Sequence, residues 1–319
     1  MTPPRRWRLA ARVLHPVRHR LLPWVVLAVG IGLALPTTSG ALVPVVPLLL
    51  AGQVLGVSLN LTPADFRAAA RRVHLVGAAL LLEWTVLPAL AVLVSRAIPS
   101  RELASGVVIC AVAPAEITSG LMAAVAGGDA ALATSITAGS LALAAFLVPA
   151  WLGVALGGTS QFNPLSVVGE LGLSVLVPLL AGVVLRARFP RLAQYRHLFL
   201  DLSAACLVLV VLAGIGPARP ALLSPTLLPI VLLAGGVLLA GGALGWGLGR
   251  ALSLPRPTAT AVGFPVAIRE FGVAIAVAVA VLPQAAAVAG VYGILMVAGA
   301  GTVAAWLGSP GLSGSRETR

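Results

Sequence analysis

Apolar stretches of about 20 residues, the length of one helical membrane crossing, follow one another along almost the whole chain. This recurrence limits the fold more than any single motif. Ten such stretches with short connections use most of the 319 residues, of which 59% are hydrophobic and only 9% charged. The mean hydropathy of +1.06 lies well outside the range of water-soluble domains. The sequence therefore predicts an all-α polytopic membrane protein with about ten transmembrane helices.

The expected crossings are bounded by arginine, proline, glycine or polar clusters. They lie near residues 22–37, 41–60, 74–95, 102–126, 130–156, 165–186, 198–216, 226–249, 257–283 and 286–307. This division predicts three parts: a basic N-terminal tail over 1–21, a single transmembrane domain over 22–307 and a C-terminal tail over 308–319. It leaves no room for a water-soluble domain.

The arginines set the expected orientation of the chain. Every basic residue is Arg, and 17 of the 21 fall in the two tails and in alternate connections. Because Lys and Arg gather on the cytoplasmic side, both termini are predicted to be cytoplasmic, in a bacterial cell (inner) membrane. The net charge of +12 does not indicate a nucleic-acid partner, since these arginines lie between apolar runs rather than on one amphipathic face. The expected partner is the lipid bilayer.

The fourth and ninth stretches contain helix-breaking and polar residues near their middles. The fourth stretch carries Pro114, Glu116, Thr118, Ser119 and Gly120. The ninth stretch carries Gly263, Pro265, Arg269, Glu270 and Gly272. Proline removes a backbone donor, and glycine lets the chain leave helical geometry. In hydrocarbon, such a break survives only where protein or a watery cavity satisfies the freed backbone groups.

The two prolines are 151 residues apart, close to half the chain length. This distance suggests two five-helix repeats, over about 22–157 and 164–307, and because five is odd the second repeat would be inverted. Inverted repeats with breaks at equivalent positions indicate the midplane site of an alternating-access carrier. A kink that only aids packing is the alternative interpretation, and a matched pair of charged breaks makes it the weaker one.

Four ionisable residues are expected inside the membrane, where a charge costs at least about 2.5 kcal/mol and so usually faces a partner or a pathway. They are Glu83 in the third stretch, Glu116 in the fourth, and Arg269 and Glu270 in the ninth. If the two breaks cross, Arg269 is expected to meet Glu116 in a structural ion pair. Alternatively, its planar fork binds the carboxylate or sulfate of an organic anion.

The carboxylates inside the membrane suggest a coupling ion. An unpaired carboxylate in a low-dielectric site tends towards protonation, which makes Glu83 and Glu116 candidates for proton coupling. No nucleophile, metal-ligand or phosphate-binding motif is present, so neither an enzyme nor a resident cofactor is expected. A channel is harder to exclude, because pores also use polar breaks in helices. The oligomeric state is left open.

The run from Pro114 to Met122, followed by Gly128 and Asp129, resembles the fourth-helix signature of the bile acid:sodium symporter superfamily. Supporting similarity covers about residues 22–307 and includes Thr62–Phe66, Pro88, Pro149, Pro178 and Gly182. The resemblance implies a six-helix core with a smaller panel, and broken helices 4 and 9 that cross, bind sodium and face a cavity. The function it implies is secondary transport of a small organic anion by alternating access.

In helix 4 and the helix after it, the resemblance implies only a partial sodium site. Ser119 and Thr137 match sodium-ligand positions, while Gly120 stands at the usual Asn and Ala133 at the usual Ser. The two hydroxyl residues are therefore residual sodium-site candidates.

In helix 9, aligning Gly272 with the family glycine puts Pro265 at a sodium-binding Glu and Arg269 at a Gln. The resemblance then implies a sodium-independent or proton-coupled carrier in which Arg269 supplies the charge of the ion. A gap in helix 9 would instead bring Glu270 to the ligand position, and the carrier would remain a sodium symporter.

A second alternative comes from a related branch, the arsenite efflux carriers. The run Phe271–Ala278 resembles their ninth helix. That branch has a cysteine directly after the helix-4 proline, where this chain has Ala115, and Cys110 lies five residues earlier. Metalloid efflux is therefore the minority interpretation.

Overall fold

The computed structural model describes residues 21–62, 67, 70–156 and 164–309, and this part of the chain is helical. Seven helical spans in it are long and apolar enough to cross a membrane: Pro36–Ser58, Val73–Ser95, Ala130–Leu156, Leu165–Arg188, Pro190–Leu222, Leu227–Ala251 and Pro283–Gly308. Shorter apolar helices cover Leu21–Ala34 and Phe271–Val281. The prediction of a helical membrane protein is confirmed, whereas the predicted tails and most of Thr62–Phe66 lie outside the described residues.

The helices of the first half are α2 (Leu21–Ala34), α3 (Pro36–Gly40), η1 (Val43–Val45), α4 (Val46–Ser58), α6 (Val73–Leu81), η2 (Leu82–Val86), α7 (Leu87–Ser95), α8 (Arg101–Val112), α9 (Ser119–Val125) and α10 (Ala130–Leu156). Those of the second half are α11 (Pro164–Leu171), η3 (Gly172–Leu176), α12 (Val177–Arg188), η4 (Pro190–Tyr195), α13 (Arg196–Leu222), α14 (Leu227–Ala251), α15 (Arg256–Ala267), α16 (Phe271–Val281), η5 (Pro283–Ala285) and α17 (Ala286–Gly308).

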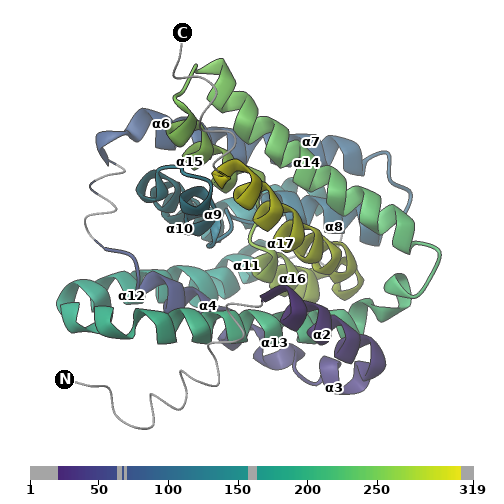
Figure 1. Cartoon of the computed structure of the whole chain (residues 1–319). Helices are drawn as coiled ribbons and strands as arrows, with labels where there is room; N and C mark the ends of the chain where they lie inside the picture. The colour runs from purple at the N-terminus through teal and green to yellow at the C-terminus, as the bar shows by residue number, and fades with distance from the viewer. Residues whose placement is uncertain (1–20, 63–66, 68–69, 157–163, 310–319) are drawn as a thin grey trace.

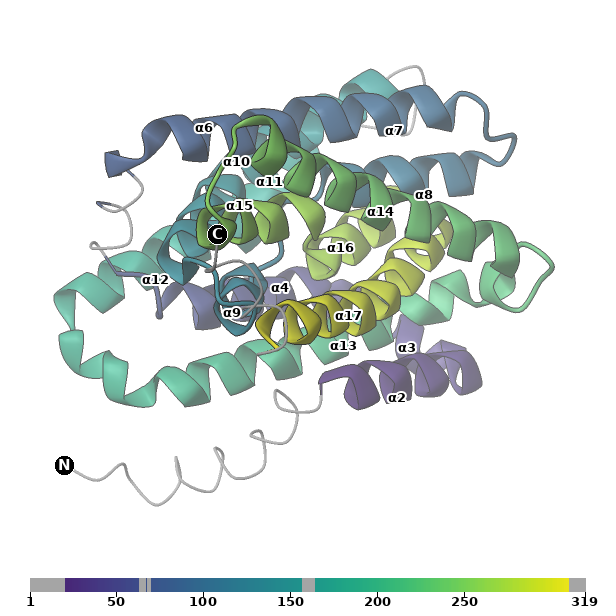
Figure 2. The ribbon, with the colours of Figure 1, turned by 45° about the horizontal axis from the view of Figure 1, so that its top comes forward.

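Two groups of helices enclose the broken ones (Figures 1 and 2). On one side, α13 packs against α2, α3 and α4, and α4 also packs against α12. On the other side lie α6, α7 and α14. The two broken stretches, α8 with α9 and α15 with α16, lie between these groups and contact α10 and α17. The breaks are therefore shielded by protein from the surrounding lipid.

Two of the crossings contain a π-helical turn shortly before a proline. The first, η2, precedes Pro88, and the second, η3, precedes Pro178. Proline lacks an N–H and its ring collides with the carbonyl one turn earlier, so a wider turn relieves the clash. Glu83 lies in the first of these turns and is fully buried.

The seventh stretch is longer than predicted, because α13 continues to Leu222 instead of ending at 216. The hydroxyl of Ser39 on α3 accepts from the Gly216 amide at 3.0 Å and donates to the Leu212 carbonyl. A side chain inserted into the helix ladder in this way compensates for the groups freed around Pro217. The proline therefore does not end the helix.

Small residues let α14 approach α15 backbone to backbone. A Cβ added at Gly241 would lie 2.6 Å from the Ala267 carbonyl oxygen, and one added at Gly245 would lie 2.6 Å from that of Gly263. Contacts between small residues four apart are a common way for membrane helices to associate. Here the contact fixes the last turn of α15, directly before the break.

Candidate functional site

The two breaks meet through their backbones. The extended segments between α8 and α9 and between α15 and α16 form one isolated antiparallel bridge, which pairs Ala115 with Arg269. The Glu116 amide donates to the Ile268 carbonyl at 2.9 Å, and the Glu270 amide donates to the Pro114 carbonyl at 2.8 Å. Each break thus supplies hydrogen-bond partners that the other lost on leaving the helix.

The extended geometry sorts the charged side chains onto two faces of this crossing. Residues directly opposite each other in an antiparallel pair point to the same side, and neighbours along the chain point to opposite sides. Arg269 therefore points to one face, here named the arginine face. Glu116 and Glu270 point to the other, the acid face. The predicted pairing of Arg269 with Glu116 is wrong for this reason.

On the arginine face, Arg269 pairs with Glu83, with 2.7 Å between Nη1 and Oε1. The guanidinium also donates to three carbonyl oxygens: Ala113 at 3.3 Å, Val266 at 2.6 Å and Pro265 at 3.4 Å. The Arg269 and Glu83 side chains are 1% and 0% exposed. Because α8 and α15 end here, the cation also lies where the negative ends of their dipoles converge.

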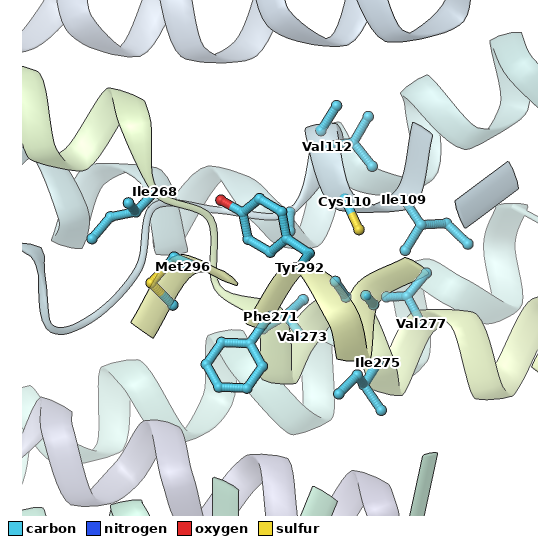
Figure 3. Packing of buried hydrophobic residues seen from close by; sticks show 14 of the residues in the cluster. Ile109, Cys110, Val112, Ile268, Phe271, Val273, Ile275, Val277, Tyr292 and Met296 are labelled. Atoms are coloured by element: carbon cyan, nitrogen blue, oxygen red, sulfur yellow. The ribbon is translucent and has the colours of Figure 1, made fainter. Parts of the chain in front are cut away.

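Two residues that the sequence did not single out complete this face. The Ser140 hydroxyl of α10 donates to Glu83 and accepts from the Ala115 amide, at 2.8 Å for the latter. The Tyr292 hydroxyl of α17 accepts from the Arg269 amide at 2.8 Å. Figure 3 shows the Tyr292 ring in the apolar cluster, near Cys110 and Phe271. Neither residue had a sequence signal beyond an uncharged polar group in a mainly apolar helix.

On the acid face, Glu270 caps α16. Its Oε1 accepts from the Gly272 amide at 3.1 Å and from Gln53 Nε2 of α4 at 2.8 Å, and its Oε2 accepts from the Ile117 amide at 3.5 Å. Glu116 Oε1 accepts from the amide and hydroxyl of Thr118 at 3.3 and 3.4 Å, and the Glu116 carboxyl lies on the same face as that of Glu270. Gln53 is the third residue that sequence reasoning missed.

The residual sodium-site candidates lie beside the crossing rather than in either face. Ser119 Oγ and Thr137 Oγ1 are 2.6 Å apart, and Thr137 Oγ1 also bonds the Ala133 carbonyl at 3.1 Å. The two hydroxyls thus satisfy each other. Sodium prefers several oxygen ligands, and Gly120 and Ala133 contribute no side-chain oxygen, so this set does not fit a sodium ion. Among the described residues, no group of three or more His, Cys, Asp or Glu is placed to hold a metal ion.

Asp129 lies outside the apolar spans, where the chain turns from α9 into α10. Its Oδ1 accepts from the Leu132 amide at 3.0 Å, which is the hydrogen bond of a helix N-cap, and Arg72 Nη1 lies 2.6 Å from its Oδ2. Partial burial raises the pKa of Asp129, but the Leu132 amide and the Arg72 guanidinium outweigh burial and hold that pKa below its usual value. The Asp129 amide also donates to Pro257 at 3.1 Å, which links this turn to the start of α15.

Apolar helices that break in pairs and cross at buried charges are typical of secondary membrane transporters. Comparison with known proteins names the family. The model of the Sodium Bile acid symporter family matches residues 47–220, and the chain belongs to this family.

The relatives that match this chain carry transporter names. The chain is 25% identical over 261 residues to an uncharacterized sodium-dependent transporter, YocS, of Bacillus subtilis, covering 81% of this chain and 80% of that protein. It is 31% identical over 215 residues to the human sodium/bile acid cotransporter 4, covering 63% of this chain and 48% of the human protein. It is 34% identical over 131 residues to the Arabidopsis thaliana probable sodium/metabolite cotransporter BASS4, covering 39% and 30%.

Proposed function

We propose that this chain is a secondary active carrier of a small organic anion, working by alternating access, in which Arg269 takes the place of a coupling sodium ion. The observation that carries the proposal is the environment of the Arg269 guanidinium. It is fully buried, paired with Glu83 and bonded to three backbone carbonyl oxygens at the crossing. A carboxylate with several carbonyls is the kind of oxygen shell that binds a hard cation.

A fixed guanidinium differs from sodium because it cannot leave. The charge of Glu83 and the dipole ends of α8 and α15 are compensated in every state of the cycle. Sodium then gains nothing by binding at this position. The anion-binding role expected for Arg269 is less favoured, because its guanidinium donates to protein oxygens and is not exposed. The proton is the remaining candidate for coupling.

The proposed topology is ten crossings in two inverted repeats, about 22–157 and 164–307, within the cell membrane and with cytoplasmic ends. The seven long apolar spans, the short apolar α2 and the two broken stretches account for ten. The breaks at Pro114 and Pro265 occupy matching positions in the two halves. The 22–307 domain, with tails on either side, follows from this topology.

The metalloid alternative gains no support from the site. Cys110 lies within α8 and is fully buried, whereas the break itself contains Ala115. A sodium symporter with a shifted ninth helix is also less favoured, because Glu270 caps α16 and accepts from Gln53 and Ile117 rather than joining Ser119 and Thr137.

A thermal-shift screen tests the proposal. The purified chain is heated with small carboxylates and sulfonates, once in sodium buffer and once with sodium replaced by N-methylglucamine. We expect at least one anion to stabilise the chain equally in both buffers, and to exchange in counterflow across proteoliposomes. Arg269→Gln should restore a sodium requirement or abolish transport, whereas the exposed Arg219→Gln should leave both unchanged. Wild-type transport that rises steeply with sodium at constant pH and membrane potential would refute the proposal.

A further inference from the structure

The acid face lacks a counter-ion. Glu116 and Glu270 are 2% and 0% exposed, and the pairing of Ala115 with Arg269 places both carboxyl groups on this same face. Two ionised carboxylates have no proton to share and repel each other strongly when buried. The basic side chain at the crossing, Arg269, points to the opposite face, where Glu83 already neutralises it. The α16 N-terminus supplies only about half a positive charge, enough to favour one carboxylate but not two.

Two unmatched acceptors give independent support for a missing hydrogen. Glu116 Oε2 and Gln53 Oε1 are buried and have no hydrogen-bond donor among the described residues. Gln53 is 2% exposed and points at this face, because its Nε2 donates to Glu270 Oε1. Buried acceptors without donors are unfavourable, and a proton on this face would give Glu116 Oε2 the hydrogen bond that it lacks.

We propose that Glu116 and Glu270 form a binding site for a single proton, shared between the two carboxyl groups, and that this proton controls the contact between the crossing and α4. The inference rests on the proposed function, because it names the coupling ion and its site. The Glu116–Glu270 pair replaces Glu83 as the proton-coupling candidate. The Glu83 carboxylate is already neutralised by its ion pair with Arg269, and it accepts a hydrogen bond from Ser140.

The groups near the Glu116–Glu270 pair are weaker candidates for binding the proton. On α17, Tyr292 accepts a bond from the Arg269 backbone, and on α8 the Cys110 thiol lies in an apolar cluster (Figure 3). On α13, Cys206 lies against Gly52, next to Gln53. On the α10 side the neighbours are hydroxyls, Ser140 and Thr137. The two other buried carboxylates of the described residues are Glu83, which is paired with Arg269, and Asp201, which lies near the start of α13. The proton is therefore assigned to the Glu116–Glu270 pair.

Loss of the proton has a mechanical consequence. When the proton passes from the carboxyl group to water, two facing carboxylates remain. They must then separate or be hydrated. Gln53 connects this pair to α4, which packs with α12 and α13 in the group on one side of the breaks. Separation of the carboxylates therefore strains a contact between that group and the crossing. An organic anion also meets less repulsion while the proton is bound, so proton and anion would travel together.

Infrared difference spectroscopy of the purified chain tests the site without any substrate. The C=O stretch of a buried, protonated carboxyl is recorded in H2O and in D2O as the pH is varied. We expect Glu116→Gln to lose the equivalent of one protonated carboxyl relative to wild type, because the Gln amide donates the bond that the proton supplied. The nearly isosteric Glu270→Gln provides a second variant if the first is unstable. Glu102→Gln, at the partly exposed first turn of α8, is the matched control and should lose nothing.

Three results would overturn the proton site: an unchanged band in both variants, an equal loss in the control, or removal of the wild-type band by sodium at constant pH. The last result would make the pair a sodium site. The band needs no transported anion, so a chain that moves none of the tested anions would refute the proposed function and leave the proton site standing. In a chain that transports, Glu116→Gln should lose accumulation driven by a pH gradient.

Discussion

The two faces of the crossing differ in how their charges are balanced. On the arginine face, Arg269 and Glu83 form a neutral pair that is also bonded to backbone carbonyls and to Ser140, although Glu83 Oε2 and Arg269 Nε have no partner among the described residues. On the acid face, Glu116 and Glu270 lie together without a basic residue, and two buried acceptors lack donors. The faces are separated by one residue along each extended segment, so the backbone register alone keeps them apart.

This difference separates a permanent charge from an exchangeable one. A buried ion pair with satisfied hydrogen bonds resists change, because removal of either partner leaves an isolated charge. A pair of carboxyls changes its net charge when one proton arrives or leaves. We therefore expect mutations on the arginine face to affect mainly folding, and those on the acid face to affect mainly coupling.

The largest effect is expected for Arg269→Ala. It leaves the Glu83 carboxylate buried without its cation, which should cost about 3–5 kcal/mol in the free energy of unfolding. Thermal unfolding in detergent measures the loss. The double variant Arg269→Gln with Glu83→Gln should recover much of it, because neither charge then remains buried. If the double variant were as unstable as the sum of the two single Gln variants, the two side chains would not be coupled and the comparison of faces would break down.

Ser140→Ala should have the next largest effect. It removes the donor to Glu83 and leaves the Ala115 amide without its acceptor, at a cost of about 1–3 kcal/mol. Ser174→Ala is the matched control, because Ser174 is equally buried but bonds only the carbonyl of its own helix at Glu170. Equal destabilisation of the two variants would show that Ser140 is an ordinary helix serine. The infrared band of the acid face should be unchanged in both.

A glycine substitution tests whether the close packing of α14 against α15 stabilises the arginine face. Gly241→Ala places a methyl group 2.6 Å from the Ala267 carbonyl oxygen, next to Val266, whose carbonyl accepts from Arg269. We expect about 1–3 kcal/mol of destabilisation from overpacking. Gly247→Ala, on the same helix with open space around it, should be neutral or stabilising by about 0.5–1 kcal/mol. If Gly241→Ala were also neutral, the close contact would not position the break.

The sequence predicted the elements of this structure better than their contacts. Hydropathy and arginine spacing located the apolar spans, and proline with glycine located both breaks, because these signals are local. The partner of Arg269 is different, since it depends on the register in which two extended segments pair. A shift of one residue would exchange the faces. Glu83 also comes from a third helix, whose π-helical turn was not predicted.

The contributions of Ser140, Tyr292 and Gln53 could not be predicted for a related reason. Each is an uncharged polar residue in a mainly apolar helix, and from the sequence alone such a residue can bond its own helix as easily as a distant one. The packing of α4, α10 and α17 around the crossing determines which partner each side chain bonds. Asp129 could be predicted, because an N-cap bonds an amide three residues away in its own chain segment.

Substitutions of Asp129 are expected to have the smallest effect on stability. They also allow a carboxylate outside the crossing to be compared with the two on the acid face. Asp129→Ala removes the cap of α10 and should cost about 0.5–2 kcal/mol. Asp129→Asn keeps the cap but loses the charge opposite Arg72, a partly exposed pair that contributes at most about 1 kcal/mol.

The pH dependence of stability distinguishes the two Asp129 substitutions. The folded state holds the pKa of Asp129 below its usual value of 3.8, so its stabilising contribution is present above that value and is lost as the pH falls through the folded-state pKa. Thermal unfolding at about pH 7 and about pH 3 should therefore show a smaller acid-induced loss in Asp129→Asn than in wild type. An equal loss in both proteins would mean that Arg72 does not stabilise the charged form. In contrast, Glu116→Gln should change proton-driven accumulation, because the proton on the acid face belongs to the transport cycle.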